Sequence, residues 1–111
     1  MTSSQPDLDR LLHAVADPTR RRILEILREP AAQTKVSTFA QPPVGQSKKG
    51  LCLCAGDIEE QIRLSQPTIS HHMTILTNSG LVDAVKQGQW RWYRRNTTAI
   101  RRLLKLLRTK L

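Results

Sequence analysis

Long apolar runs are absent from the sequence, and this absence limits the class of protein. No stretch approaches the roughly 20 consecutive apolar residues that a membrane-spanning helix needs. We therefore predict no membrane span, no signal peptide and no membrane partner. The 111 residues, of which 24% are charged and 39% hydrophobic, have the composition of one soluble domain. A chain this short also leaves no room for a multi-step enzyme with its own cofactor domain.

Acidic residues are missing from residue 86 to residue 111. This segment holds nine of the 18 Lys and Arg residues, whereas all nine Asp and Glu residues lie before it. The formal net charge of +9 therefore belongs to the C-terminal end of the chain. A basic field of this kind indicates a polyanion as partner, although a charged face that meets only solvent has the same composition. Charge alone does not distinguish a polyanion-binding surface from a solvated charged face, so a sequence motif is needed.

Apolar spacing predicts two helices in the N-terminal part. Apolar residues at i, i+3, i+4 and i+7 from Leu8 predict a short amphipathic helix over residues 8–16. Asp17 can accept hydrogen bonds from the unpaired N–H groups of a helix start, and Pro18 fits the first turn. A second helix is therefore expected to begin here and to end before Pro30.

Residues 30–50 interrupt the helical pattern. They contain three Pro, two Gly and only three large apolar residues, which predicts an exposed inserted loop. Helical spacing returns in a short helix over about residues 57–64. Ser65 followed by Pro67 then predicts the start of a further helix over 66–78.

After Gly80 the apolar period changes from helical to alternating. This change predicts a β-hairpin over residues 82–94 with a basic tip at 86–89. Asn96 can cap a last helix over 97–111, whose leucines form one stripe. The predicted fold is mainly α with a small β-hairpin, a single winged helix-turn-helix domain over all 111 residues.

The helix predicted over 66–78 has an apolar face and a polar face. Ile69, Met73 and Leu76 share one side, which leaves hydrogen-bonding side chains on the other. Such side chains reach base edges when the helix lies in the major groove, and a cationic wing contacts the flanking backbone. An ordinary solvated helix face is the alternative interpretation. The residues predicted to contact DNA are Gln66, Thr68, Ser70, His71, Thr74, Lys86, Gln87 and Arg91.

Three segments in order resemble a known family, the ArsR/SmtB winged-helix repressors. The segments are DPTRRRILEIL (17–27), LSQPTISHHMTILTNSGLV (64–82) and KQGQWRWYRRN (86–96), with the 30–50 loop counted as an insertion. The resemblance implies a cytoplasmic homodimer that represses transcription from a palindromic promoter operator, and in many members an inducer releases the DNA. It places Gln66, Thr68, Ser70 and His71 on the recognition helix and residues 86–89 on the wing tip.

The first and last predicted helices carry apolar stripes that are expected to pack against another protein surface. Together they are more apolar than the core of so small a domain is expected to cover, which indicates an interface between two copies of the chain. The alternative is that both stripes pack onto the chain's own core. The residues predicted at the dimer interface are Leu8, Leu11, Leu12, Leu103, Leu104 and Leu107.

Cys52 and Cys54 stand where many arsenic- or cadmium-sensing relatives carry a cysteine pair followed directly by an acid. Here the acid comes later, at Asp57, and no third cysteine follows. The last helix, residues 97–111, also lacks the His and carboxylates of the other metal site of the family. The pattern resembles the SdpR-like members, which lack the metal site, so we predict no metal and no cofactor. A repressor that responds to As(III), another metal or an oxidant through the two thiols is the alternative.

The aromatic and nucleophilic residues bear on two further classes of function. Trp90, Trp92 and Tyr93 lie among cations, as in proteins that stack single-stranded bases, so an RNA-binding winged helix is a more distant alternative. Strand alternation favours their packing against the helices instead. No enzyme is predicted, because neither cysteine has a His base near it in the sequence and no phosphate-binding loop occurs.

Overall fold

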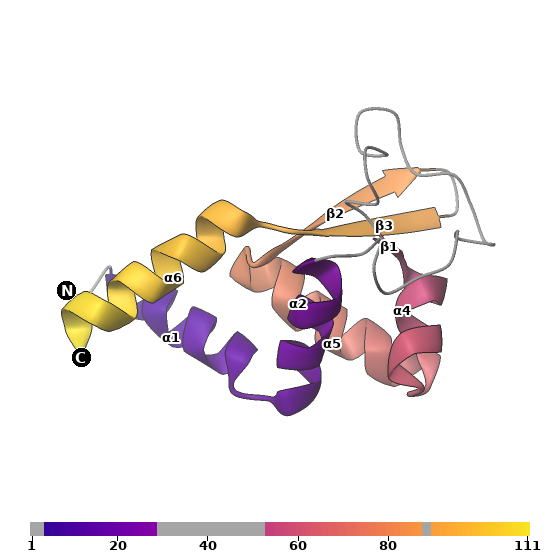
Figure 1. The fold of residues 1–111 in the computed structure, drawn as a ribbon, viewed down its shortest axis with the longest axis horizontal. Coiled ribbons are helices and arrows are strands. Elements are labelled where there is room, and N and C mark those ends of the chain that lie inside the picture. Colours follow the sequence, from indigo (N-terminus) through magenta and orange to yellow (C-terminus); the bar gives the residue numbers. More distant parts are fainter. Residues whose placement is uncertain (1–3, 29–52, 88–89) are drawn as a thin grey trace.

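The computed structural model describes residues 4–28, 53–87 and 90–111. The predicted 30–50 loop, Cys52 and the centre of the hairpin tip lie outside these residues. The described chain is mostly helical with an antiparallel hairpin, which confirms the predicted fold class (Figure 1). Its elements are α1 (Ser4–Val15), α2 (Pro18–Arg28), β1 (Leu53–Cys54), α4 (Ala55–Ile62), α5 (Gln66–Ser79), β2 (Val82–Gln87), β3 (Trp90–Arg95) and α6 (Thr97–Lys110).

Three helices begin at the polar residues that the sequence suggests. The Asp17 carboxylate accepts from the N–H of Thr19 at 2.8 Å, at the start of α2. The side chain of Ser65 caps α5, and Asn96 Oδ1 accepts from the N–H of Ala99 at 3.0 Å in the first turn of α6. Each bond satisfies a donor that has no partner inside the helix, so short polar side chains fix these boundaries.

Two helices and one strand differ from the sequence-based prediction. Helix α1 begins earlier than predicted, and α4 ends at Ile62, so Leu64 lies outside the helix and is 41% exposed. Strand β1 was not predicted. It pairs antiparallel with β3, with Leu53 opposite Tyr93, and the sheet order is β1-β3-β2. A strand of two residues shows no period of its own, and only the neighbouring β3 edge stabilises it.

The hydrophobic core lies where α1, α2 and α5 pack against one another and against the hairpin. Helices α1 and α6 lie side by side at one end of the molecule, and α4 with the hairpin at the other (Figure 1). Among the described residues, no helix is both long enough and apolar enough to cross a membrane. The largest fully buried side chains include Trp92, Ile23, Ile26, Ile58, Ile69, Met73, Leu76 and Leu81.

Candidate DNA-binding surface

A tight turn joins α4 to α5 and sets the direction of α5. Arg63 adopts a left-handed conformation with φ of 62°, and its N–H donates to the Glu59 carbonyl at 2.8 Å. Ser65 then caps α5, and Pro67 occupies its first turn. Gly80, with φ of 85°, ends the helix at a conformation that residues with a Cβ rarely adopt. The α4–turn–α5 unit is a helix-turn-helix.

Helix α5 has the two faces that its sequence predicts. Ile69, Met73 and Leu76 are buried in the core. The predicted contact residues of this helix, Gln66, Thr68, Ser70, His71 and Thr74, are all exposed. The polar face therefore meets solvent along the helix and is available to a partner.

Local hydrogen bonds divide these exposed side chains into two groups. The Thr68 hydroxyl bonds the Ser65 hydroxyl at 2.8 Å, and the Thr74 hydroxyl donates to the Ser70 carbonyl at 2.9 Å. Gln66 and Ser70 form no side-chain hydrogen bond with any described residue, so their donors and acceptors are available for base edges.

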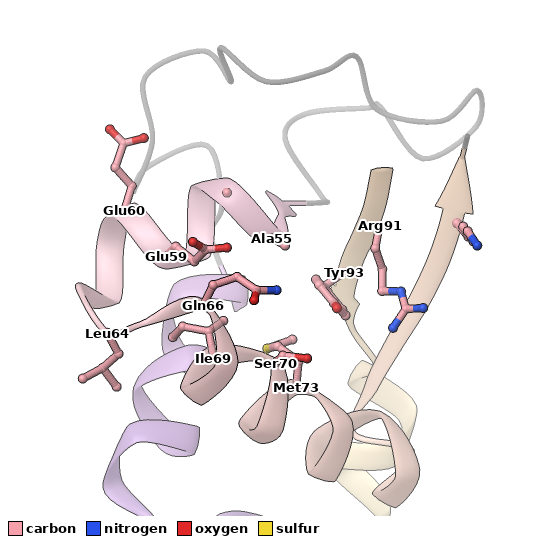
Figure 2. A pocket seen from close by; sticks show the side chains of 12 residues that line it. Ala55, Glu59, Glu60, Leu64, Gln66, Ile69, Ser70, Met73, Arg91 and Tyr93 are labelled. Carbon is pink, nitrogen blue, oxygen red and sulfur yellow. The ribbon is translucent and has the colours of Figure 1, made fainter. Parts of the chain in front are cut away.

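A cleft of about 840 Å³ lies between α4, α5 and the hairpin. Figure 2 shows Gln66 and Ser70 on one side of it and Arg91 on the other. Lys86 also lines the cleft, so the structure brings together residues of the predicted recognition helix and of the predicted wing. Glu59 and Glu60 form the α4 wall, and sequence reasoning did not single them out.

Tyr93 anchors the wing at the cleft. It is buried in the core cluster, and burial raises the pKa of its hydroxyl above the ordinary value, although the neighbouring Arg91 guanidinium opposes this rise. Arg91 and Lys86 are paired across the hairpin and both are exposed. The Gln87 side chain lies outside the described residues. The buried Tyr93 and the exposed cations make the hairpin a positively charged rim of the cleft.

The structure divides the predicted dimer residues. Leu8, Leu11 and Leu103 are buried in the chain's own core. Leu12 is 37% exposed and Leu104 is 57% exposed, whereas Leu107 is half-buried. The alternative of packing onto the chain's own core therefore holds for the first three, and a smaller apolar patch on α1 and α6 meets solvent.

Comparison with known proteins gives concordant results. Residues 48–84 match the family described as "Bacterial regulatory protein, arsR family". The transcriptional repressor SdpR of Bacillus subtilis is 32% identical over 93 residues, which are 84% of this chain and 80% of SdpR. The chain belongs to the arsR family. The arsenical resistance operon repressor of Staphylococcus aureus is also 32% identical, over 84% of this chain and 69% of that protein.

Solved structures agree with the fold. HlyU from Vibrio cholerae aligns with a TM-score of 0.63 at 25% identity, over 96% of this chain and 94% of that chain. An ArsR family transcriptional regulator aligns with a TM-score of 0.72 at 19% identity, over 99% of this chain and 92% of that chain. This arsR-family chain is thus a winged-helix, DNA-binding transcription regulator and not an enzyme.

Cys54 lies in the interior of the domain. Cys54 is fully buried, and its thiol donates to the Asp57 carboxylate at 3.2 Å. The same carboxylate oxygen accepts from the Cys54 N–H at 3.3 Å. No group of three His, Cys, Asp or Glu side chains within 4–28, 53–87 and 90–111 could hold a metal ion. One partner of this thiol is therefore a helix-capping carboxylate.

Two of the three aromatic residues of β3 are buried. Trp92 is 1% exposed and Tyr93 is 5% exposed, so bases cannot stack on either ring. The prediction that these rings are packed rather than exposed is correct for both. The Trp90 side chain lies outside the described residues. The arrangement gives the RNA-binding alternative no support at the two buried rings.

Proposed function

We propose that this arsR-family regulator is a cytoplasmic homodimeric repressor that binds a palindromic operator and blocks its promoter. In this proposal α5 lies in the major groove and the hairpin contacts the flanking backbone. The observation that carries it is the cleft, because Gln66 and Ser70 of α5 line the same hollow as Lys86 and Arg91 of the hairpin. The names of its relatives SdpR and the arsenical resistance repressor support repression as the outcome.

The chemistry of the two cleft walls assigns a role to each. Amide and hydroxyl groups such as those of Gln66 and Ser70 distinguish bases by paired donors and acceptors in the major groove. The cations Lys86 and Arg91 attract phosphates without regard to sequence. Glu59 and Glu60 repel phosphates, so the nucleic-acid backbone is expected to follow the hairpin side of the cleft and not the α4 side.

The exposed leucines support a second copy of the chain as the partner of α1 and α6. Leu12 and Leu104 stand on helices that pack side by side, and Leu111 at the end of the chain is 94% exposed. A two-fold axis at this end of the molecule would leave both α5 helices on outer surfaces. Two such helices read half-sites separated by about one DNA turn, roughly 34 Å.

Footprinting on the DNA upstream of the regulator's own gene tests the proposal. We expect a symmetric protected segment, with two halves about one helical turn apart. The experiment is repeated with Ser70→Ala and with Asn78→Ala, which alters an exposed residue near the end of α5. Loss of protection with Ser70→Ala alone supports the assignment. An asymmetric footprint, or equal protection by both variants, contradicts it.

A further inference from the structure

Arg20 is a charged residue buried inside the domain. It is 6% exposed, and its guanidinium contacts three hydrogen-bond acceptors, two on α1 and one on α5. Its Nε donates to the Ala14 carbonyl at 2.8 Å, and its Nη2 donates to the His13 carbonyl at 2.9 Å. Both carbonyls belong to the last turn of α1, where the His13 carbonyl also accepts from the N–H of Ala16 at 3.2 Å, so the guanidinium adds hydrogen bonds at the helix end. Arg20 thereby fixes α2 to the end of α1.

The third contact of Arg20 reaches the proposed recognition helix. Nη1 lies 3.1 Å from Nδ1 of His72, a residue of α5. Because a guanidinium is only a donor, Nδ1 must accept, which requires a neutral imidazole that carries its proton on Nε2. The side chain of His72 is 12% exposed. One guanidinium therefore connects α1, α2 and α5.

Asp17 completes this cluster from the junction between α1 and α2. Its Oδ2 accepts from the N–H of Thr19 and, at 3.1 Å, from the N–H of Arg20. The same oxygen lies 4.0 Å from Nδ1 of His72. The carboxylate thus holds the start of α2, from which Arg20 projects, and supplies negative charge beside the imidazole.

The two adjacent histidines of α5 occupy opposite environments. His71 is exposed on the polar face, whereas His72 points toward α2. Their ring centroids are 5.8 Å apart. A change of charge at His71 alters the surface that meets DNA, while a change at His72 alters how α5 is attached to the domain. Substitutions at these two positions therefore distinguish an effect on the DNA-facing surface from an effect on the attachment of α5.

We propose that Arg20 is a positioning residue for operator recognition, which holds α5 in its DNA-reading orientation through a hydrogen bond to neutral His72, so that specific binding weakens when His72 is protonated. This inference rests on the proposed role of α5. Protonated His72 carries a donor at Nδ1, which faces the Arg20 donor and cannot accept from it. The ring must then turn toward Asp17, and Arg20 loses its described hydrogen bond to α5.

The electrostatic surroundings give the direction of the pH dependence. Burial lowers the pKa of His72 below its ordinary value, and the Arg20 and His71 charges lower it further, against the opposing attraction of Asp17. A histidine with a lowered pKa in the folded state destabilises the fold as the pH falls, because the unfolded chain binds the proton first. The arrangement is therefore fully present above about pH 6.5, and it is lost progressively below that pH.

The test measures affinity for an operator duplex that the wild-type protein selects from a random-sequence pool. A shuffled duplex of equal length controls for general electrostatics, and thermal unfolding at each pH monitors the fold. Between about pH 7.5 and 5.5 we expect the ratio of operator to shuffled affinity to fall, by less than about tenfold because the pKa of His72 lies below its ordinary value. His72→Asn retains an acceptor near Nδ1 and cannot be protonated, so its ratio should change less than about twofold over that range.

His71→Asn removes the other imidazole of α5. It is expected to weaken operator binding at every pH, because His71 lies on the DNA-facing side, but not to abolish the fall of the ratio at low pH. Arg20→Lys should lower the ratio about tenfold at the higher pH as well, because one ammonium cannot reach acceptors on both helices. The proposal is overturned if His72→Asn retains the wild-type pH dependence, or if His71→Asn abolishes it. Ser70→Ala separates the two levels of inference. If it leaves operator affinity unchanged, the role of α5 itself fails, whereas a loss in Ser70→Ala beside a flat wild-type pH profile removes only the role of Arg20 and His72.

Discussion

The two ends of the molecule both display cations but differ in the other side chains that they expose. The α1–α6 end displays the exposed Leu12 and Leu104 together with the cations of α6, whereas the cleft end displays polar side chains of α5 opposite Lys86 and Arg91. Charge alone would assign both ends to DNA. The exposed leucines separate them, because apolar surface gains free energy by meeting another protein and not a phosphate backbone.

The difference shows that a net charge identifies a class of partner and not its position. Helix α6 has five of the nine cations that follow residue 85, at Arg101, Arg102, Lys105, Arg108 and Lys110. Only Lys86 and Arg91 line the cleft. We therefore expect changes at the α6 end to act mainly on assembly and changes at the cleft to act on DNA, and the following predictions test this division.

The largest effect is expected from a charge in the exposed apolar patch. Leu104→Glu would place a carboxylate in the proposed dimer interface, where removing its charge from water destabilises the dimer. Sedimentation should then report monomers, with weakened operator binding. Lys105→Glu changes an exposed neighbour on the same helix and should remain dimeric. If the wild type itself is a monomer at micromolar concentration, the assignment of this end to assembly is wrong.

A smaller effect is expected on the polar face of α5. Ser70→Ala or His71→Ala should weaken binding to the operator by about 1 to 3 kcal/mol and change the unfolding free energy little, since both residues are exposed. Titrations with the operator and with a shuffled duplex measure the effect on specificity. If operator affinity stays unchanged in both variants, the polar face of α5 is not the surface that contacts the operator.

The wing should contribute binding without sequence preference. Lys86→Ala is expected to weaken binding to all duplexes alike and to lower the slope of log affinity against log salt by about one unit. Lys110→Ala removes an equal charge from the α6 end and should leave that slope unchanged if the two ends are as distinct as proposed. A loss confined to one sequence would contradict a phosphate contact at Lys86.

The smallest effect is expected from the thiols. Cys52→Ser/Cys54→Ser should bind the operator like the wild type, with or without zinc, cadmium or arsenite, because a serine hydroxyl can also donate to Asp57. Gel-shift titration measures this. Release of the wild type by arsenite or peroxide, with the double variant still bound, would instead establish the cysteines as a sensor.

Short-range sequence signals made much of the proposed DNA-contacting face of α5 predictable. Ser65, Pro67 and Gly80 mark the ends of α5, and the helical spacing of its apolar residues decides which side chains remain outside. The division of the leucine stripes was not predictable in the same way. Leu103 and Leu104 are neighbours of identical chemistry, yet one is 5% exposed and the other 57%. Only the packing of α6 against α1 separates them.

The sequence by itself determined the kinds of element, the two faces of α5 and the basic C-terminal end, because caps, periodicity and charge act within a few residues of one another. The tertiary structure decided which surfaces these elements share. The cleft lies between α5 and the hairpin, and Arg20 forms a hydrogen bond with His72, which is 52 residues away in the sequence. Contacts of this range depend on how the helices pack around the core, and no local pattern in the chain specifies them.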